Sequence, residues 1–401
     1  MSDVIAVYYF EPGKNTTPEF AAQAIADEET TGTWTDLSTR ASYVKRLDGK
    51  VNSLKSFGEG YITEIMYPAE IFEPGNISQY LSVVAGNLFG LGRLDSVRLL
   101  DINLPKELTT SFKGPQFGID GVRKLIGTDK TKRPHVGTII KPKVGLNPKD
   151  TAEVAYLAAI GGVDFIKDDE TLTNQSFCPM KERVEAVMGR LDEAMAETGR
   201  TILYAANVSE RADRIVERAR EAIDCGANAI MVDVITCGFS AVEALADDPG
   251  IKVPVHVHRT MHAAMTRNKK HGIAMRTFAR LVRLAGGDQL HTGTVSGKMG
   301  HDPKEIINDN LTLTGSYSGL KTVFPVASGG LYPGRIHDEL KTLGTELILQ
   351  AGGGIHGHPE GTKSGAAAMR QAVDAYMEGA SLEEYAKTHR ELRLAIEKWG
   401  I

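Results

Sequence analysis

Residues 136–166 read VGTIIKPKVGLNPKDTAEVAYLAAIGGVDFI, and this stretch contains two short apolar runs separated by a longer segment with helical spacing. Short runs rich in β-branched residues predict buried strands, and the spacing between them predicts a helix. The same two-part unit recurs to the end of the chain. The eight apolar runs are 136–140, 164–166, 201–205, 229–234, 253–257, 289–292, 322–326 and 346–350.

Eight strand-then-helix units in succession predict an α/β fold, the (β/α)8 TIM barrel. The segment between the second and third runs carries one apolar helical stripe, formed by Val184, Val187, Met188, Leu191 and Met195. Gly199 and Gly226 stand where a left-handed cap would end a helix. A doubly wound open sheet is the alternative, and the number and even spacing of the units favour the barrel.

The first part of the chain breaks this rhythm. It predicts a strand at 4–9, a helix at 18–28, a hairpin near 61–71, a helix at 77–88 and a strand at 97–102. We therefore expect an α+β, ferredoxin-like N-terminal domain over residues 1–112 and a barrel catalytic domain over 113–401. The boundary would fall within the glycine- and lysine-rich stretch 111–133.

Composition excludes several classes of protein. The 401 residues include 46 basic and 51 acidic side chains, which gives no overall electrostatic preference for nucleic acid or an anionic membrane. Cys178, Cys225 and Cys237 are odd in number and have no CxxC spacing, so neither a disulfide framework nor a zinc site is indicated. No apolar window approaches 18 residues, and the first residues lack a basic leader. We expect a cytoplasmic protein with no nucleic-acid or membrane partner.

Chemistry in a TIM barrel gathers at the carboxyl ends of the strands. Six of the eight runs lead into polar or glycine-rich segments. These are Lys141-Pro142-Lys143, Lys167-Asp168-Asp169-Glu170, His256-Val257-His258-Arg259, His291, Ser328-Gly329-Gly330 and Gly352-Gly353-Gly354.

The second run ends in the most informative of these segments. Strand alternation places Lys167 and Asp169 on one side, and a bulge or turn would bring Glu170 beside them. Two converging carboxylates form a hard oxygen site suited to Mg²⁺. A plain charged turn remains an alternative, and Lys167 is either a salt-bridge partner or chemically converted into a further ligand.

The glycines after the last two runs indicate a phosphate site, because exposed backbone N–H groups at this place in the fold bind phosphate. Plain turns are the alternative. The sixth run opens a glycine-bearing loop with Lys298 near its tip, the composition of a mobile lid. Together with Lys141, Lys143 and Arg259, Lys298 would surround the mouth with cations. Such a site suits a doubly phosphorylated substrate and an enolate-like charge.

At these positions the sequence resembles ribulose-1,5-bisphosphate carboxylase/oxygenase (RuBisCO), and most resembles the archaeal type without small subunits. The resemblance covers essentially the whole chain. The matching segments are TGTWT at 31–35, GNLFG at 86–90, KPK at 141–143, GGVDFIKDDE at 161–170, HRTMH at 258–262, HTGTVSGK at 291–298 and SGG at 328–330.

The resemblance implies a role for each reactive side chain. Lys167 would react with CO₂ to give a carbamate that binds Mg²⁺ with Asp169 and Glu170 and later takes the substrate proton. Lys141 would donate and accept protons, with its pKa lowered by the nearby Lys143. His258 would serve acid–base steps, and Lys298 would hold the incoming CO₂.

The resemblance also implies how the substrate is held. One phosphate would meet Thr33, Trp34, Gly330, Gly352 and Gly353, and the other Arg259, His291 and Ser328. Glu28 would orient Lys298, and Asn87 would touch the substrate and metal region. Since the first domain of this family reaches the partner subunit's barrel, the implied active unit is a homodimer or a ring of dimers.

Two departures from the family pattern are visible. Met299-Gly300-His301-Asp302 follows Lys298 where plant and form II members carry Glu-Gly-Glu, and Ile139 replaces a threonine of the plant enzymes. Both bear on loop closure, gas specificity or substrate fit.

The expected activity is the addition of CO₂, or of O₂, to the enediolate of ribulose 1,5-bisphosphate, giving 3-phosphoglycerate with CO₂. One alternative is a RuBisCO-like enolase of the 2,3-diketo-5-methylthiopentyl-1-phosphate type, or a decarboxylase of another phosphosugar. A non-catalytic phosphosugar binder is the other, and ligand binding that ignores both Mg²⁺ and CO₂ would indicate it.

Overall fold

The structure is a computed structural model, and it describes residues 2–296 and 302–401. The chain divides into two compact units. The first comprises Met1–Lys113 with Met261–Ala285 and Tyr317–Leu320, and the second comprises Gly114–Thr260, Gly286–Ser316 and Lys321–Ile401. The division into domains at residues 112 and 113 stays a prediction.

The first unit contains a five-stranded sheet in the order β10-β4-β1-β3-β2. Strand β1 pairs antiparallel with both β3 and β4, and it buries Val4, Ala6, Tyr8 and Phe10 in the alternation expected of a half-buried strand. The order of β1 to β4 with helices α1 and α2 is ferredoxin-like, as predicted. The elements are β1 (Val4–Pro12), α1 (Pro18–Glu28), β2 (Lys50–Phe57), β3 (Gly60–Tyr67), α2 (Ile77–Ala85) and β4 (Leu94–Asn103), with η1 (Ser42–Leu47), η2 (Ala69–Ile71), η3 (Leu88–Gly90) and α3 (Lys106–Thr109).

The predicted hairpin near 61–71 is wrong in extent. The hairpin consists of β2 and β3, and residues 69–71 form the short helix η2 instead of strand. Strand β2 reads KVNSLKSF and lies at the sheet edge, where most of its side chains are half-buried or exposed. Because such a strand needs few apolar residues, its sequence lacks the signal that marked the other strands.

The segment Met261–Ala285 belongs to the first unit through backbone and charge contacts. Strand β10 (Gly272–Ile273) pairs parallel with β4, and Ala274 donates a backbone hydrogen bond to Leu99 at 2.8 Å. In helix α11 (Met275–Ala285), Arg280 makes two hydrogen bonds of 2.8 and 3.0 Å to the buried carboxylate of Asp101. Helix α10 (Ala263–Thr266) precedes this strand. None of these contacts was predicted.

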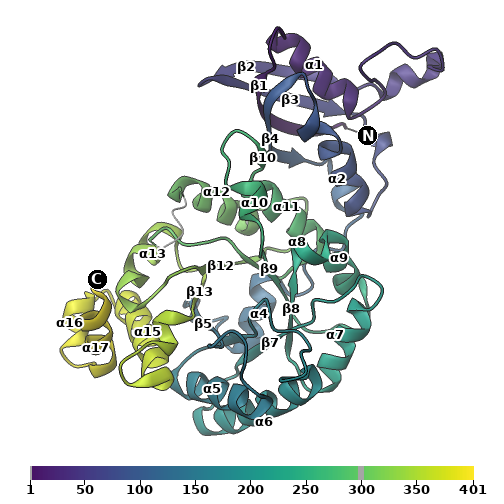
Figure 1. Cartoon of the computed structure of the whole chain (residues 1–401). Coiled ribbons are helices and arrows are strands. Elements are labelled where there is room, and N and C mark those ends of the chain that lie inside the picture. The colour runs from purple at the N-terminus through teal and green to yellow at the C-terminus, as the bar shows by residue number, and fades with distance from the viewer. Residues whose placement is uncertain (1, 297–301) are drawn as a thin grey trace. The chain divides into compact units, whose positions relative to one another are not determined.

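The second unit is a closed barrel of eight parallel strands, in the order β11-β12-β13-β5-β6-β7-β8-β9. Each strand pairs with its neighbours in sequence around the ring, as Figure 1 shows, so the barrel is confirmed and the doubly wound sheet is excluded. The strands are β5 (His135–Ile139), β6 (Phe165–Lys167), β7 (Leu203–Asn207), β8 (Ala229–Asp233), β9 (Val255–His258), β11 (Gln289–His291), β12 (Phe324–Ser328) and β13 (Ile348–Ala351).

Helices of the second unit surround the strands on the outside of the barrel (Figure 1). Helix α6 ends at a left-handed Gly199 (φ 66°), and Gly226 follows α7 with φ 102°, so both predicted glycine turns are confirmed. The helices are α4 (Gly118–Ile126), α5 (Pro148–Gly161), α6 (Met180–Thr198), α7 (Ile215–Asp224), α8 (Val234–Cys237), α9 (Phe239–Asp247), α12 (Pro303–Thr314), α13 (Ile336–Leu343), α14 (Gly353–His356), α15 (Gly361–Glu378), α16 (Leu382–Ala386) and α17 (Arg390–Trp399), with η4 (Pro333–Arg335).

The floor of the barrel is an apolar plug. Ile119, Val122 and Ile126 on α4 pack against the first residues of the strands, among them Phe165 and Phe324. This packing closes the amino-terminal end and leaves polar side chains to the carboxyl ends, where the candidate site lies.

Candidate active site

The centre of the site is the segment that follows β6. Lys167, the last residue of the strand, has a fully buried side chain whose Nζ donates a hydrogen bond of 2.7 Å to the carbonyl of Asp168. The same Nζ lies 3.8 Å from Glu170 Oε2. Burial lowers the pKa of Lys167, against the attraction of Glu170 and Asp169. The amine therefore loses its proton more readily than an exposed lysine.

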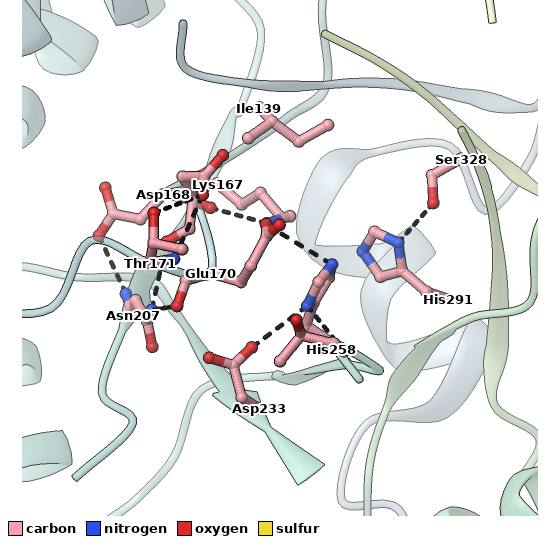
Figure 2. Close-up of polar contacts among 12 residues, drawn as sticks. Ile139, Lys167, Asp168, Glu170, Thr171, Asn207, Asp233, His258, His291 and Ser328 are labelled. Atoms are coloured by element: carbon pink, nitrogen blue, oxygen red, sulfur yellow. Dashed lines mark hydrogen bonds and ion pairs between the residues drawn. The ribbon is translucent and has the colours of Figure 1, made fainter. Parts of the chain in front are cut away.

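Asp169 lies beside this lysine and faces two donors. Lys141 donates to Asp169 Oδ2 at 2.8 Å, and the Thr171 hydroxyl donates to Oδ1 at 2.9 Å. Burial opposes ionisation of Asp169, but these hydrogen bonds outweigh it and keep its pKa below the usual value. The structure thus brings Lys167 and Glu170 together (Figure 2), with Asp169 beside them and Lys141 as its partner. Glu170 stands at a turn after the strand, which is the geometry proposed for it from the sequence.

Asp168 points the other way and has a different role. Its buried carboxylate accepts hydrogen bonds from the Tyr204 hydroxyl at 2.6 Å, Asn207 N at 3.0 Å and Arg183 Nε at 3.2 Å. Asn207 also reaches forward, donating from Nδ2 to the carbonyls of Asp169 and Glu170 at 3.2 Å each (Figure 2). These contacts fix the backbone on which the reactive side chains stand.

His258, at the end of β9, lies near Lys167 and Glu170. Its Nδ1 lies 3.2 Å from Asp233 Oδ1, and its Nε2 lies 3.7 Å from Glu170 Oε2 (Figure 2). Burial, and then the charge of Lys167, lower the pKa of His258. These two effects outweigh the hydrogen bond to Asp233, which raises it. A neutral imidazole held by a carboxylate at Nδ1 suits proton transfer at Nε2.

Sequence reasoning missed Asp233 and Asn207. Both are the last residues of their strands, β8 and β7. Asp233 lay within an apolar run, AIMVDV, and Asn207 lies two residues beyond the predicted end of the third run. Ending each run at the first polar residue after its apolar stretch would have found both.

A second group of predicted residues lies around β11, β12 and β13. His291 Nδ1 lies 2.6 Å from Ser328 Oγ (Figure 2). Arg259 is buried, which lowers its pKa to about 10 despite the attraction of Asp309. Gly330 has φ 92°, a backbone conformation that favours glycine.

Gly352 and Gly353 follow β13, and Gly352 lies against Lys141. A Cβ at Gly352 would stand 3.1 Å from Lys141 Cε, so the missing side chain leaves room for that lysine. Lys143 is exposed on the loop after β5.

Four predicted residues belong to the first unit. Glu28, Thr33 and Trp34 line a hollow of about 530 Å³, in which Trp34 is 79% exposed. Asn87 is exposed at the start of η3, and the buried Glu29 accepts a hydrogen bond from Gly86 N at 3.1 Å beneath it. Lys298, together with Met299, Gly300 and His301, lies outside the described residues.

Asp169, Glu170 and Lys167 are the residues of the site that bear on metal binding. Among the residues that the structure describes, no three His, Cys, Asp or Glu side chains form a group that could hold one. Asp169 and Glu170 supply two carboxylates, and the third position of their cluster is Lys167. A lysine carbamate would complete a set of oxygen donors, so the residues fit Mg²⁺ once Lys167 is modified. No helix of the described chain is long and apolar enough to cross a membrane.

Fold and site together define a TIM-barrel enzyme whose reactive side chains stand at the carboxyl ends of the strands. Two family descriptions match the chain: the ribulose bisphosphate carboxylase large chain, N-terminal domain, over residues 1–108, and the catalytic domain of the same chain over 118–399. The chain belongs to the family of the ribulose bisphosphate carboxylase large chain, whose members are carbon–carbon lyases. Among the alternatives weighed from sequence, family membership supports the carboxylase.

Archaeal relatives align over nearly the full length. The ribulose bisphosphate carboxylase of Pyrococcus furiosus is 43% identical over 399 residues, covering 99% of this chain and 94% of that protein. The octameric RuBisCO of Pyrococcus horikoshii superposes with a TM-score of 0.95 at 42% identity, covering 100% of this chain and 94% of that chain. The dimeric RuBisCO of Hyperthermus butylicus gives 0.91 at 38% identity, covering 100% and 96%.

Proposed function

We propose that this enzyme adds CO₂ to the enediolate of ribulose 1,5-bisphosphate, adds water to the product and cleaves it into two molecules of 3-phosphoglycerate, with O₂ competing for the same enediolate. The observation that carries the proposal is the fully buried Lys167, whose Nζ lies 3.8 Å from Glu170 and whose neighbour Asp169 faces the same site. Burying a lysine between carboxylates costs folding free energy. Ionisable groups in such settings cluster at functional sites.

Lys167 is the proposed activation site. Its lowered pKa favours the neutral amine, whose nitrogen lone pair attacks the carbon of CO₂ and forms an N–C bond. The nitrogen loses a proton to solvent, and the product is a carbamate anion. With Asp169 and Glu170, the carbamate would hold Mg²⁺, which when bound supplies a Lewis acid for the substrate oxygens. The carbamate oxygen is the proposed acceptor of the substrate proton in enolisation.

The other proton transfers fall to side chains around the same cluster. Lys141, which donates a hydrogen bond to Asp169 at 2.8 Å, is the proposed proton donor and acceptor, and Lys143 is the second cation proposed on the same loop. His258, oriented by Asp233, is the proposed acid–base group for the hydration and enolisation steps. Lys298 would hold the incoming CO₂ and its developing carboxylate.

The two phosphates of the substrate would bind at two places. The first set of residues comprises Thr33, Trp34, Gly330, Gly352 and Gly353, and the second comprises Arg259, His291 and Ser328. Glu28 and Asn87 would act from the first domain of a partner subunit, which makes a homodimer the smallest active unit. Of the solved relatives, that of Pyrococcus horikoshii is an octamer and that of Hyperthermus butylicus is a dimer, and for this chain we propose a dimer or a ring of dimers without small subunits. The free thiols of Cys178, Cys225 and Cys237 support a cytoplasmic location.

The test follows labelled bicarbonate into acid-stable 3-phosphoglycerate with Mg²⁺ and ribulose 1,5-bisphosphate. Lys167→Met keeps the buried volume but removes the amine, so incorporation should fall to background while the circular dichroism spectrum stays unchanged. Lys149→Met, at an exposed lysine of the same barrel, is the control and should keep full activity. Normal turnover by Lys167→Met would overturn the carbamate mechanism. Solvent-deuterium exchange at the sugar carbon without label incorporation by the unsubstituted protein would indicate an enolase instead.

A further inference from the structure

Four side chains on neighbouring barrel strands form an unbroken chain of hydrogen bonds. Gln289 Oε1 lies 2.7 Å from His256 Nδ1, and His256 Nε2 lies 2.8 Å from His291 Nε2. His291 Nδ1 then lies 2.6 Å from Ser328 Oγ, and Figure 2 shows this last link. Gln289 and His256 are direct partners in the register of β11 and β9, so the strand pairing fixes their contact. We call these four residues the buried chain.

Only one end of the buried chain reaches the mouth of the barrel. The side chains of Gln289 and His256 are fully buried and His291 is 3% exposed, whereas Ser328 is half-buried. Burial lowers the pKa of His256 and of His291 well below the usual value, and the charge of Lys167 and the neighbouring histidines add to the effect. Both rings are therefore neutral, each with one N–H and one bare nitrogen.

Because both rings are neutral, all hydrogen bonds of the buried chain must run from donor to acceptor in the same direction. Each contact needs one donor and one acceptor, so the group that Gln289 turns to His256 decides every later link. If the amide oxygen faces His256, protons point inward and the Ser328 hydroxyl donates to His291. If the amide nitrogen faces His256, His291 donates to Ser328 and the hydroxyl is free to donate to a ligand.

Rotation of the Gln289 side-chain amide would satisfy a buried N–H group. With Oε1 facing His256, the buried Nε2 has no hydrogen-bond partner among the described residues. Exchanging the two ends by rotation gives this N–H an acceptor, His256 Nδ1. An unpaired buried carbonyl is then left, which folded proteins tolerate more often than an unpaired N–H.

We propose that Gln289 is a positioning residue that sets the direction of the buried chain, and that substrate phosphate selects the outward direction in which Ser328 donates to it. This inference rests on the proposed function, in which Ser328 binds a phosphate of ribulose 1,5-bisphosphate. A phosphate dianion accepts hydrogen bonds only, so it gains nothing from a hydroxyl that donates inward. An amide serves both directions because it carries an acceptor and a donor on one side chain.

The discriminating variant is Gln289→Glu, whose carboxylate accepts a hydrogen bond from the His256 Nδ1–H and holds the inward direction. The KM for ribulose 1,5-bisphosphate and the inhibition constant for inorganic phosphate should both rise by about tenfold to a hundredfold, the range for a lost hydrogen bond to a charged group. Gln289→Met, which favours neither direction, should change both by less than about threefold. A merely structural role would give the opposite order, since Glu resembles Gln more closely than Met does.

Gln350→Glu is the matched control, because it buries the same charge at another interior glutamine of the barrel, on β13. It should leave both constants within about twofold. Equal effects of the two substitutions would show a general repulsion of phosphate and overturn the inference. So would unchanged constants for Gln289→Glu.

The direction itself is measurable without turnover. In protein labelled with ¹⁵N-histidine and saturated with inorganic phosphate, His291 should carry its proton on Nδ1, and in Gln289→Glu on Nε2. The same nitrogen protonated in both proteins would overturn the inference. If Gln289→Glu does not fold, Gln289→Met should show both tautomers of His291, and a single tautomer identical to the unsubstituted protein would count against it.

Ser328→Ala separates this inference from the proposed function. If Ser328 binds phosphate, Ser328→Ala raises KM and Gln289→Glu adds nothing further in that background. If Ser328→Ala leaves KM unchanged, the phosphate role of Ser328 fails, and the histidine tautomers still decide whether Gln289 sets the direction.

Discussion

Removing the carboxylate of Asp168 should destabilise the barrel more than any change at the catalytic face of the same segment. The side chains of Asp168 and Arg183 are both fully buried and pair at 3.1 Å, and Asp168 also accepts hydrogen bonds from Tyr204 and Asn207. Asp168→Ala leaves a buried guanidinium without its counter-charge and orphans two further donors. Breaking one side of a buried ion pair costs about 3–5 kcal/mol, a large share of the stability of a folded domain.

The assay is equilibrium unfolding in urea, followed by circular dichroism and tryptophan fluorescence. The midpoint should fall with an unchanged slope, and Asp168→Leu combined with Arg183→Met should recover at least half of the loss because it removes both charges. Asp213→Ala, which breaks the exposed pair with Arg211, is the control and should cost under about 0.5 kcal/mol. A loss below about 1 kcal/mol for Asp168→Ala, or a double variant no better than the single one, would refute the reasoning.

Three further predictions concern other parts of the chain. Burial raises the pKa of Glu29 from 4.5 to about 7, so its contribution to stability is present at low pH and is lost between about pH 4.5 and 7, by about 3 kcal/mol at most. Glu29→Gln should flatten this part of the stability–pH curve, and an unchanged curve would contradict the shift. Gly365→Ala should destabilise the folded protein by about 1–3 kcal/mol, because the new Cβ would stand 2.0 Å from the Ile355 carbonyl oxygen. At Gly189, within a helix, a new Cβ would meet nothing within 4 Å, so Gly189→Ala should stabilise the folded protein by about 0.5–1 kcal/mol. Thermal unfolding of the two variants, shifted in opposite directions, checks this pair. Asp233→Asn should lower kcat about tenfold to a hundredfold with little change in KM, because His258 loses the carboxylate at Nδ1. The rate of label incorporation measures kcat, and full activity would show that Asp233 has no part in the site.

The barrel could be predicted because its strands are buried on both faces and read as β-branched runs. The same rule failed at β2, which lies at a sheet edge and has the polar sequence KVNSLKSF. It also missed β10, whose two residues pair with β4 although some 170 residues separate them in the chain. Pairing across such distances leaves no local pattern in the sequence.

The site was predicted where reactive residues follow a strand in succession and was missed where one polar residue ends an apolar run. The segment 167–170 is recognisable by its four consecutive charged residues, and its geometry follows from strand alternation for Lys167 and Asp169 and from a turn for Glu170. Asp233 and Asn207 give no such signal, because a single polar residue at a strand end is common. The role of Gln289 needs the register of two strands, which appears only in the folded barrel.

The segment that follows β6 places side chains that stabilise the fold on one side and side chains of the reactive site on the other. On one side, Asp168 meets Arg183, Tyr204 and Asn207, and these donors hold its carboxylate in place. On the other side, Asp169 accepts hydrogen bonds from Lys141 and Thr171, and Glu170 Oε2 lies at the longer distances of 3.8 Å from Lys167 Nζ and 3.7 Å from His258 Nε2. The Asp168 carboxylate is therefore held by three hydrogen bonds and a buried ion pair, whereas Glu170 makes longer contacts to Lys167 and His258. Substitution of Glu170 by Gln should then remove activity at little cost in unfolding free energy, whereas Asp168→Ala loses both. Equal destabilisation by the two substitutions, measured in the same urea titration, would show that the two sides are not separate.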